Sequence, residues 1–397
     1  MQGIRKRTWA EINLDNAAWN YQQIRKQTRK DAKVCCVIKA NAYGHNAVKL
    51  ASLYASLGAD YLAVSNLEEA VQLREANISL PILILGYTPP ECADLLASHH
   101  ISQCVYSRTY GEALSQAAMS AGVRVHIHIK IDTGMGRIGF QHHGGHSELS
   151  DANAVCHLPC LLTEGIFTHF ASADEGEAGE AYTRAQFAAF EEAISYLESK
   201  GISFTIRHCA NSAAIFDYPE FHLDMVRAGV VLYGLRPSAD VRNLPELRPV
   251  MTLKSVISHM KLLAKGDSVS YGHTYTAESD RMVATVPIGY ADGFWRANAG
   301  DCKMLIRDRL FPLIGRVCMD QLMLDVTGAN DLAVGDIVTI FGDPEGRCSA
   351  DLIAEHTGTI NYEVVCAVGE RVPRFFLQYG EPIGVSDNIL HGSRGSI

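Results

Sequence analysis

Strand and helix patterns alternate through the first 240 residues, and this alternation restricts the fold more than any other feature. Eight short runs rich in apolar and β-branched residues read as strands, namely 34–38, 61–64, 82–85, 102–105, 123–131, 162–167, 204–208 and 223–226. Repeated strand–helix units build parallel sheets, and eight of them in about 230 residues match a (β/α)8 barrel. We therefore predict an α/β fold with such a TIM-type barrel over residues 13–240.

The run 123–131 carries polar side chains on one face. Because side chains alternate along a strand, one face holds His126, His128, Lys130 and Asp132. In a barrel these groups would line the lumen near the C-terminal end of the strand, where a ligand-facing role is plausible and buried polar groups need partners. An edge strand with one solvent-exposed face explains the same pattern equally well.

The composition changes after residue 240. A proline-bearing connector is followed by short β-rich runs that are separated by Gly, Asp and Asn, without long helical patterns. This pattern predicts a C-terminal all-β domain over residues 241–388, with an N-terminal strand at 5–12 as a candidate to join it. Residues 389–397 read as a flexible tail.

Composition restricts the partners. The 397 residues are 47% hydrophobic and 20% charged, and the formal net charge is -9. An acidic chain without a basic stripe is not expected to bind nucleic acid or an anionic membrane, and a small-molecule substrate fits better. No stretch reaches about 18 apolar residues and the N-terminal segment lacks an apolar core, so we expect neither a membrane span nor a signal peptide, and a cytoplasmic location.

The eleven cysteines form no C-x-x-C pair and their spacing is scattered. We therefore expect reduced thiols, with neither a disulfide framework nor a structural zinc site. His142, His143 and His146 lie in a polar, glycine-containing stretch, where a solvated loop is favoured over metal binding. No metal site is predicted.

Lys39 follows the buried strand of the run "VCCVIKANAYGH", residues 34–45. A lysine at a strand end is usually a surface cation whose stem lies on the sheet. Here Asn41, Tyr43 and His45 place hydrogen-bonding groups beside the amine, and Gly44 adds a flexible backbone. This setting suits a lysine that forms a Schiff base with a phosphorylated aldehyde cofactor.

The segment "VIKANAYGH" resembles the pyridoxal-phosphate lysine motif of alanine racemases. Six further blocks resemble that family in the same order: "HIKIDTGMGRIGF" (128–140), "HCANSAA" (208–214), "VRAGVVLYG" (226–234), "VSYGHTY" (269–275), "PIGYADG" (287–293) and "GRVCMDQ" (315–321). The resemblance implies an isomerase that uses pyridoxal 5'-phosphate to interconvert L-alanine and D-alanine, and so supplies D-alanine for cell-wall peptidoglycan.

Racemisation removes a proton from one face of Cα and delivers another to the opposite face, so two opposed bases are needed. The resemblance implies that Lys39 is the cofactor lysine and one base. It implies that Tyr271 is the other base, contributed by the second subunit of a homodimer with shared active sites. On the sequence "VSYG" alone, Tyr271 would be an ordinary buried tyrosine.

Candidate site residues follow five of the predicted strands at their C-terminal ends, where barrels of this type hold catalytic groups: Lys39, Arg137, His169, Ser212 and Arg227. Ser212 and the backbone of Gly229 and Val230 follow strands seven and eight, where such barrels commonly bind phosphate. A helix N-cap explains Ser212 equally well. His169, without the resemblance, would be a satisfied core histidine.

The resemblance makes Arg227 the partner of the cofactor's ring nitrogen. An arginine cannot take up the proton of that nitrogen, so the ring stays largely unprotonated and reprotonation is favoured over transamination. His169 is implied as a cofactor neighbour. Tyr43 and Tyr362 are implied as phenolic donors to the phosphate.

Two cations and one backbone group are implied at the substrate side. Arg137 is expected to orient the substrate carboxylate, and Met319 to contact that carboxylate through its backbone. Lys130 matches a lysine that is often carbamylated in the family. A carbamate would turn the repulsion between Lys130 and Arg137 into an ion pair.

Three alternatives stay open. A non-catalytic pyridoxal-phosphate carrier has a similar barrel but no second domain, and a fold-related amino-acid decarboxylase pairs the ring nitrogen with an acid. A serine or broad-specificity racemase would differ in pocket size and one hydroxyl partner. Tyr362, in the setting "NYE", is bulky and favours the smaller methyl side chain of alanine.

Overall fold

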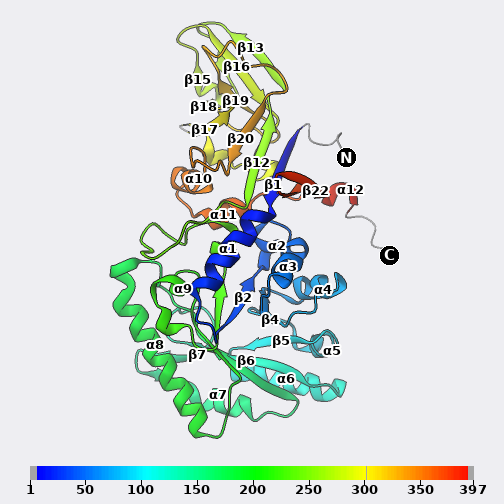
Figure 1. Ribbon diagram of the computed structural model, residues 1–397, viewed down its shortest axis with the longest axis vertical. Coiled ribbons are helices and arrows are strands. Elements are labelled where there is room, and N and C mark those ends of the chain that lie inside the picture. Colours follow the sequence, from blue (N-terminus) through cyan, green and yellow to red (C-terminus); the bar gives the residue numbers. More distant parts are fainter. Residues whose placement is uncertain (1–6, 301, 392–397) are drawn as a thin grey trace. The chain divides into compact units, whose positions relative to one another are not determined.

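The structure is a computed structural model that describes residues 7–300 and 302–391 (Figure 1). The described chain forms two compact units. The barrel unit comprises residues 18–42 and 47–247, and the sheet unit comprises residues up to 17, residues 43–46 and residues from 248 onward.

The barrel unit contains eight strands that pair in parallel with one another. They are β2 (Lys33–Val37), β3 (Tyr61–Val64), β4 (Ile82–Ile84), β5 (Ile101–Val105), β6 (Val125–Asp132), β9 (Leu161–Phe167), β10 (Ile206–His208) and β11 (Met225–Ala228). Each coincides with one of the eight predicted runs, which are confirmed. The pairing order is β10-β9-β6-β5-β4-β3-β2-β11. Backbone hydrogen bonds from Asp224 N to Arg207 O (3.0 Å) and from Arg227 N to Ala210 O (2.9 Å) close the ring.

Helices follow most of these strands and surround them (Figure 1). They are α3 (Ala47–Ser56), α4 (Leu67–Glu75), α5 (Ala93–Ser98), α6 (Arg108–Ala121), α7 (Leu149–Cys156), α8 (Gly176–Ser199) and α9 (Ala214–Asp217), with α1 (Leu14–Gln27) before β2 and α2 (Lys39–Tyr43) directly after it. Local signals set their ends: Ser107 Oγ accepts from Tyr110 N at the start of α6, and Gly122 ends it in the left-handed conformation. The alternation of short strands and capped helices therefore produces the (β/α)8 barrel.

Shorter elements complete this unit. They are the hairpin β7 (Phe140–His143) and β8 (His146–Ser147), and the 3-10 helices η1 (Pro90–Cys92), η2 (Pro219–Phe221) and η3 (Val230–Tyr233).

Strand β6 is central, because it pairs with both β5 and β9. The edge-strand alternative is therefore wrong. Of its polar face, His128, Lys130 and Asp132 are buried, whereas the side chain of His126 is 56% exposed. The polar face thus enters the barrel interior, apart from its first residue.

The sheet unit is built on one ten-stranded sheet in the order β13-β16-β19-β18-β17-β20-β12-β1-β21-β22. These strands are β1 (Thr8–Asn13), β12 (Met251–Val256), β13 (His259–Leu263), β16 (Arg281–Val286), β17 (Lys303–Ile306), β18 (Arg309–Ile314), β19 (Leu322–Asp325), β20 (Ile337–Phe341), β21 (Arg374–Gln378) and β22 (Glu381–Ser386). The N-terminal strand β1 pairs antiparallel with β12 and parallel with β21, so it belongs to this sheet.

The sheet unit also contains helices that the sequence analysis did not predict, α10 (Ala350–Thr357), α11 (Asn361–Cys366) and α12 (Asn388–His391). Ser349 caps α10 and Gly358 ends it, and these are local signals that a search for β-rich runs passes over. The 3-10 helices are η4 (Tyr271–His273), η5 (Tyr290–Asp292) and η6 (Arg296–Asn298). Most of the predicted tail at 389–397 lies outside the described residues.

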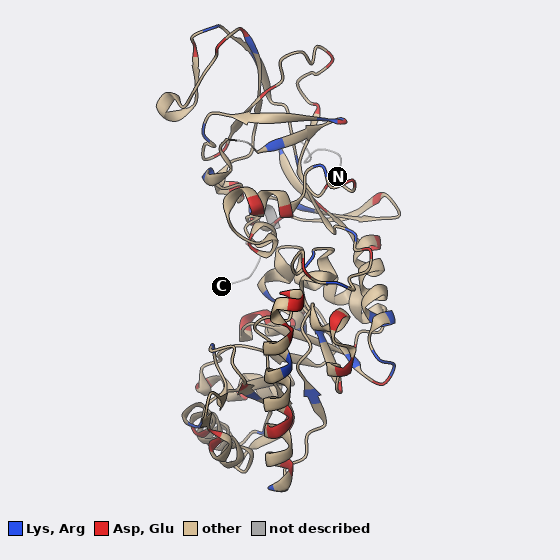
Figure 2. Cartoon of the chain, turned by 90° about the vertical axis from the view of Figure 1, so that its left-hand side faces the viewer, with Lys and Arg blue, Asp and Glu red and all other residues tan. Residues whose placement is uncertain are grey.

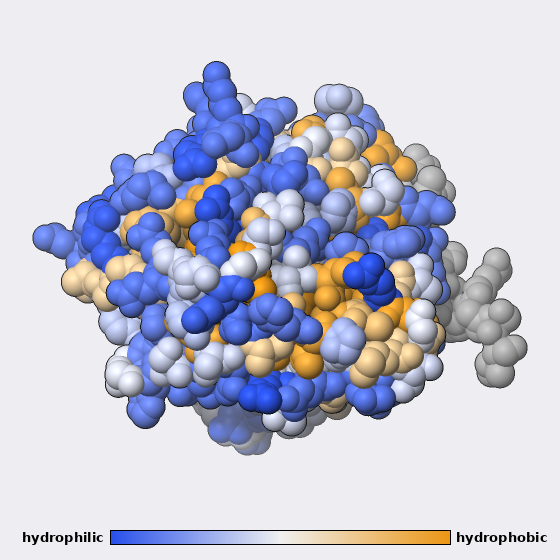
Figure 3. Space-filling view, turned by 90° about the horizontal axis from the view of Figure 1, so that it is seen from below, coloured by the Kyte–Doolittle hydropathy of each residue, from blue (hydrophilic) through white to orange (hydrophobic). Residues whose placement is uncertain are grey.

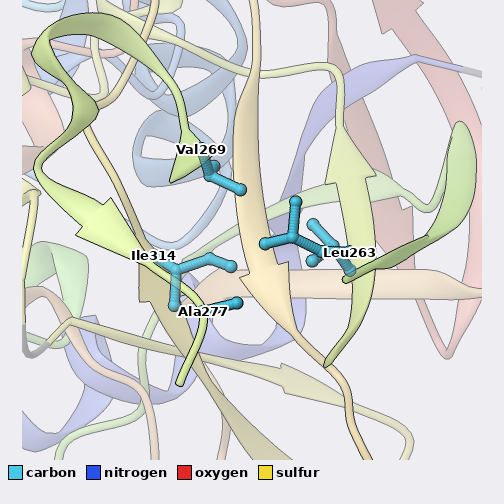
Figure 4. Close-up of a cluster of buried hydrophobic side chains, with 5 residues drawn as sticks. Leu263, Val269, Ala277 and Ile314 are labelled. Carbon is cyan, nitrogen blue, oxygen red and sulfur yellow. The ribbon is translucent and has the colours of Figure 1, made fainter. Parts of the chain in front are cut away.

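A small two-stranded sheet, β14 (Ser268–Val269) and β15 (Tyr275–Thr276), brackets η4. Side chains beside this hairpin meet those of the large sheet in a buried cluster of Leu263, Val269, Ala277, Val283 and Ile314, four of which Figure 4 labels as they point toward one another. Apolar burial therefore holds the base of the hairpin, while its tip carries Tyr271.

The surface is mixed. On the side shown in Figure 2, Lys and Arg are interspersed with Asp and Glu along the helices. The face in Figure 3 is mainly hydrophilic, and hydrophobic residues show in small areas between polar ones. Within the part of the chain that the structure describes, no helix is long and apolar enough to cross a membrane.

Candidate active site

Lys39 begins α2 directly beyond β2, at the C-terminal end of the barrel strands. The four residues after it, 40–43, all have positive φ between 51° and 54°, although none is glycine. The left-handed conformation costs roughly 1–2 kcal/mol per such residue, so the turn must be held by its surroundings. Within the barrel unit Ala42 N donates to Ile38 O (2.8 Å), and Asn41 Oδ1 accepts from Ala47 N (2.8 Å). These bonds hold the turn that follows Lys39.

Arg227, on β11, is buried among hydrogen-bond acceptors. Its Nη1 donates to His208 Nδ1 (2.9 Å), and its Nη2 donates to Thr168 O (2.8 Å), Cys209 O (3.0 Å) and His169 Nδ1 (3.2 Å). The described residues place no carboxylate within ion-pair distance of this guanidinium. It is therefore rigidly held, and its charge is not cancelled by direct contact.

His169 follows β9 and lies among cations. Burial lowers its pKa well below the ordinary value, and the charges of Arg227, Arg137, Lys130 and Lys39 lower it further. Arginine can only donate, so His169 accepts at Nδ1 and carries its hydrogen at Nε2. Four sequence-predicted residues of the barrel unit, all cations, thus act on a neutral histidine in a strongly positive site.

Lys130, on β6, is buried with its Nζ 5.5 Å from the centre of the Phe167 ring. Burial lowers the pKa of this amine to about 8, and Arg137 and Arg227 contribute to the decrease. About a tenth of the amine is therefore uncharged at pH 7, and an uncharged amine is the form that reacts as a nucleophile.

Arg137 lies in the loop after β6 and is exposed. This loop is shaped by Asp132, whose Oδ1 accepts from the backbone N–H groups of Gly134 (3.0 Å) and Gly136 (3.1 Å). Tyr182 on α8 donates to Gly134 O (2.8 Å). The part of the loop before Arg137 is therefore fixed, and the Arg137 charge acts on the buried cations Lys130 and Arg227.

Ser212 and Gly229 are joined by a hydrogen bond, from Gly229 N to Ser212 Oγ (2.9 Å). The N-cap alternative for Ser212 is not supported, because Asn211 Oδ1 is the acceptor for Ala214 N at the start of α9 (3.0 Å). Val230 begins η3. A serine hydroxyl that accepts this bond keeps its own hydrogen for a further acceptor, such as a phosphate oxygen.

Four predicted site residues lie in the sheet unit. Tyr43 and Tyr362 are neighbours, with ring centres 6.1 Å apart, and burial raises the pKa of Tyr43. Tyr271 is 63% exposed at the tip of the β14–β15 hairpin, and Met319 is 53% exposed. The first pair is thus packed, whereas the second pair faces outward.

The Met319 loop is built on close backbone contacts. Tyr290 N donates to Cys318 O (3.1 Å), and Ala291 N donates to Met319 O (3.0 Å). A Cβ at Gly289 would lie 2.2 Å from Cys318 O, so only glycine fits there. The exposed Met319 side chain therefore stands on a rigid backbone.

Sequence reasoning missed three groups that contact the Arg227 cluster. His208 accepts from Arg227, His128 follows it in the hydrogen-bond chain, and Glu164 follows His128. Two of them carried a signal, because His128 lies on the polar face of β6 and His208 is the first residue of the block "HCANSAA" (208–214). The alternation of polar and apolar residues does not stand out on the strands of His208 and Glu164, because β10 is too short and β9 is too mixed in composition.

The histidines of residues 142–146 form the β7–β8 hairpin, where His142 Nε2 contacts Glu192 Oε2 (3.3 Å) beside a surface pocket of about 390 Å³. Over the described residues, no three His, Cys, Asp or Glu side chains gather as a metal site would require.

A (β/α)8 barrel with a lysine after its first strand and a buried arginine on its last strand defines a class, the pyridoxal-phosphate enzymes of barrel fold. Residues 12–237 match the alanine racemase N-terminal domain family, and residues 250–376 match the alanine racemase C-terminal domain family. The chain belongs to the alanine racemase family, whose members are pyridoxal-phosphate-dependent isomerases.

Known relatives agree with this assignment. The chain is 48% identical to the alanine racemase of Desulfovibrio desulfuricans over 93% of this chain and 98% of that protein. It is 43% identical to alanine racemase 1 of Clostridium acetobutylicum over 96% and 98%. The solved alanine racemase of Clostridium difficile 630 has a TM-score of 0.91 at 43% identity, covering 97% of this chain and 99% of that chain. A match over both domains disfavours the carrier and the decarboxylase.

The residues present fit the cofactor of this family. Its phosphate suits the Ser212 hydroxyl and the Gly229–Val230 backbone, and its negative charge suits the cations around His169. Lys39 supplies the amine that can hold its aldehyde carbon.

Proposed function

We propose that this protein interconverts L-alanine and D-alanine with two bases, Lys39 and Tyr271. The observation that carries this proposal is the buried Arg227, hydrogen-bonded to His208 and His169, at the place where the family resemblance puts the ring nitrogen. When bound, pyridoxal phosphate supplies an electron sink that makes the Cα–H of the amino acid acidic.

Lys39 removes or returns the proton on one face of the substrate Cα. The fixed turn after Lys39 supports this role, since it holds the backbone from which the side chain extends. Tyr271 serves the opposite face. A phenol is a weak base, with a reference pKa of about 10, so it needs hydrogen bonds from neighbours such as His169 to act.

Arg227 limits side reactions. A guanidinium donates hydrogen bonds and does not exchange its proton near neutral pH. Occupying the ring nitrogen with such a donor keeps the electron sink weak, so that the proton returns to Cα quickly. Arg137 and the Met319 backbone orient the substrate carboxylate, and Tyr43 and Tyr362 donate to the phosphate.

We propose that the protein is a homodimer in which each site combines the barrel unit of one chain with the sheet unit of the other. The exposure of Tyr271 and Met319 supports this arrangement, because two residues that the resemblance places in the site face outward on their own unit, where a second chain can cover them. A two-fold dimer repeats the same contact twice and so creates two equal sites.

We propose that Lys130 is carbamylated. The lowered pKa of its amine favours reaction with carbon dioxide. The product would place a negative charge near the cations Arg137 and Arg227. Arg137 would then be oriented by an ion pair instead of being repelled.

Alanine is proposed as the preferred substrate, since Tyr362 packs against Tyr43 and leaves room for a small side chain. Discrimination against serine rests on one hydroxyl and is worth about 1–3 kcal/mol, so weak serine racemisation is expected. The proposed location is the cytoplasm, where D-alanine would enter peptidoglycan synthesis. All eleven cysteines are free thiols, as suits a reducing compartment.

The test is to purify the protein with pyridoxal phosphate and follow both enantiomers of alanine by chiral chromatography in deuterium oxide. Interconversion with one solvent deuterium at Cα supports the proposal. Decarboxylation to ethylamine, or no change of either enantiomer, contradicts it.

A further inference from the structure

A chain of hydrogen bonds crosses the barrel interior behind Arg227. Arg227 Nη1 lies 2.9 Å from His208 Nδ1, His208 Nε2 lies 2.9 Å from His128 Nδ1, and His128 Nε2 lies 3.3 Å from Glu164 Oε2. The four residues come from β11, β10, β6 and β9. Both imidazoles are completely buried.

The chemistry of its two ends gives this chain one direction. A guanidinium can only donate hydrogen bonds, and a carboxylate can only accept them. His208 must therefore accept at Nδ1 and donate at Nε2, and His128 must do the same. Burial lowers the pKa of His208 well below its ordinary value, with Arg227 adding to the effect, so this ring stays neutral.

Glu164 is the anionic end. Its Oε2 accepts from Ser102 Oγ (2.7 Å) and from Tyr61 OH (3.3 Å), besides His128. Burial would raise its pKa, but the hydrogen bonds from His128 and Ser102 outweigh burial and lower the pKa to about 2. Glu164 is therefore ionised, and a charge of opposite sign stands at each end of the two neutral rings.

The backbone is shaped around this chain. A Cβ at Gly165 would lie 2.4 Å from His128 Nδ1 and 2.5 Å from its Cε1, closer than real Cβ atoms come. Gly165 does not adopt a left-handed φ, so its backbone would accept alanine. Glycine is required there because of two neighbours, the His128 ring and Ile206 O, which would lie 2.8 Å from the Cβ.

We propose that Glu164 and His128 are positioning residues for the reaction: through His208 they fix the guanidinium of Arg227 and the direction of its hydrogen bonds. The inference rests on the proposed role of Arg227 at the cofactor ring. If it holds, residues inside the barrel contribute to the reaction by positioning Arg227, in addition to the residues at the C-terminal ends of the strands.

Glu164→Gln tests the direction of the chain. Glutamine keeps the size of the side chain, but its amide can donate as well as accept, so neither histidine is confined to one tautomer. In part of the molecules His208 then carries a hydrogen at Nδ1, facing the donor of Arg227. Arg227 moves from its place, and a solvent proton can reach the ring nitrogen.

The first readout is independent of activity. In holoenzyme labelled with ¹⁵N-histidine, two-bond ¹H–¹⁵N spectra separate ring nitrogens that bear hydrogen from those that do not, and His128→Asn and His208→Asn assign the signals. We expect hydrogen on Nε2 of both rings in the wild type and mixed tautomers in Glu164→Gln. A wild-type ring with hydrogen on Nδ1, or on both nitrogens, overturns the proposal.

The second readout is kinetic. Glu164→Gln should lower kcat by about tenfold, as loss of an orienting partner does elsewhere, with KM within about twofold. It should also raise the pyridoxamine phosphate formed per racemisation. Gly165→Ala should act in the same direction without removing a charge. Glu192→Gln is the matched control, because Glu192 also lies 3.3 Å from a histidine nitrogen but on the surface, and it should change nothing.

The outcomes separate the two proposals. A wild type that does not racemise alanine overturns the proposed function and with it the catalytic part of this inference. An active wild type whose kcat and side-product yield survive both Glu164→Gln and Gly165→Ala overturns the inference alone. Thermal unfolding by circular dichroism identifies any variant that fails to fold, and the other variant then decides.

Discussion

Site residues are held differently in the two units. In the barrel unit Arg227 is buried among hydrogen-bond acceptors and Lys130 is buried near the Phe167 ring, whereas in the sheet unit Tyr271 and Met319 are mostly exposed. Burying a cation is expensive unless its hydrogen bonds are satisfied, so the barrel interior must be organised in each chain. The exposed residues need only a rigid base, which the cluster around Val269 and the Met319 loop provide.

This contrast teaches where specificity can be built. A buried network works only as a whole, since each donor depends on the next acceptor. Exposed groups on rigid turns can be completed by another surface. In the proposed dimer, the barrel unit would therefore set the chemistry, and the sheet unit would offer groups that a second chain completes.

The largest expected effect is on the barrel side of the comparison. Lys39→Ala removes both the covalent anchor and one base, so racemisation should fall by at least about 10³-fold. The visible absorption of the lysine-bound cofactor should be lost as well. Borohydride reduction followed by peptide mass spectrometry checks the anchor in the wild type, and an adduct on any other lysine would show that Lys39 is misassigned.

The next prediction addresses the sheet side. Tyr271→Phe should be nearly inactive by itself, as Lys39→Ala is. If each site combines two chains, a mixed dimer of the two variants holds one complete site and one that lacks both bases. Random exchange at equal amounts makes about half of the dimers mixed, so activity should return to about a quarter of the wild-type value.

This experiment mixes the variants under conditions that dissociate and reform dimers, and carries the wild type through the same cycle. Native mass spectrometry confirms exchange. Activity that stays at the level of the single variants after confirmed exchange would mean that Tyr271 acts within its own chain or has no catalytic role.

Much of this architecture could be predicted from sequence. The eight barrel strands are bounded apolar runs, and their order follows from strand–helix alternation. The left-handed turn at residues 40–43 could not, because Ala, Asn, Ala and Tyr carry no local preference for it. It exists because a partner elsewhere in the fold holds it: Glu69 Oε1, on α4, accepts from Ala40 N (2.6 Å).

The site shows the same limit. Arg227 was found through a resemblance, but its partners lie on other strands and are invisible to local patterns. Ser212 fitted two roles; the N-cap role is not supported because Asn211 accepts from Ala214 N, and the bond that Ser212 does make goes to Gly229, 17 residues away in the chain. Pairings across a barrel are set by tertiary register, which single-sequence patterns do not contain.

A third prediction changes the sign of the buried charge. Arg227→Glu should allow the ring nitrogen to hold a proton, which strengthens the electron sink and lengthens the life of the carbanion. Pyridoxamine phosphate formed per racemisation should rise by about tenfold, the change that about 1.4 kcal/mol of differential stabilisation produces. If a folded variant forms as much pyridoxamine phosphate per racemisation as the wild type, Arg227 does not control the balance between transamination and racemisation.

The smallest effects concern stability, and they separate buried from exposed site residues most directly. The pKa of Lys130 falls from 10.5 to about 8 on folding, mainly through burial. Between pH 8 and 10.5 the unfolded state therefore binds more protons than the folded state, and the free energy of unfolding should rise with pH. Lys130→Met should abolish this rise and add up to about 3 kcal/mol at pH 7 in buffer free of carbon dioxide. Tyr271→Phe, at an exposed position, should stay within about 0.5 kcal/mol of the wild type at every pH. Urea unfolding measures the free energy of unfolding of all three proteins.

Bicarbonate should stabilise only the proteins that keep Lys130, because carbon dioxide then binds the folded amine. A wild type whose free energy of unfolding depends on neither pH nor bicarbonate would show that Lys130 lacks the lowered pKa and the reactive amine that its burial implies.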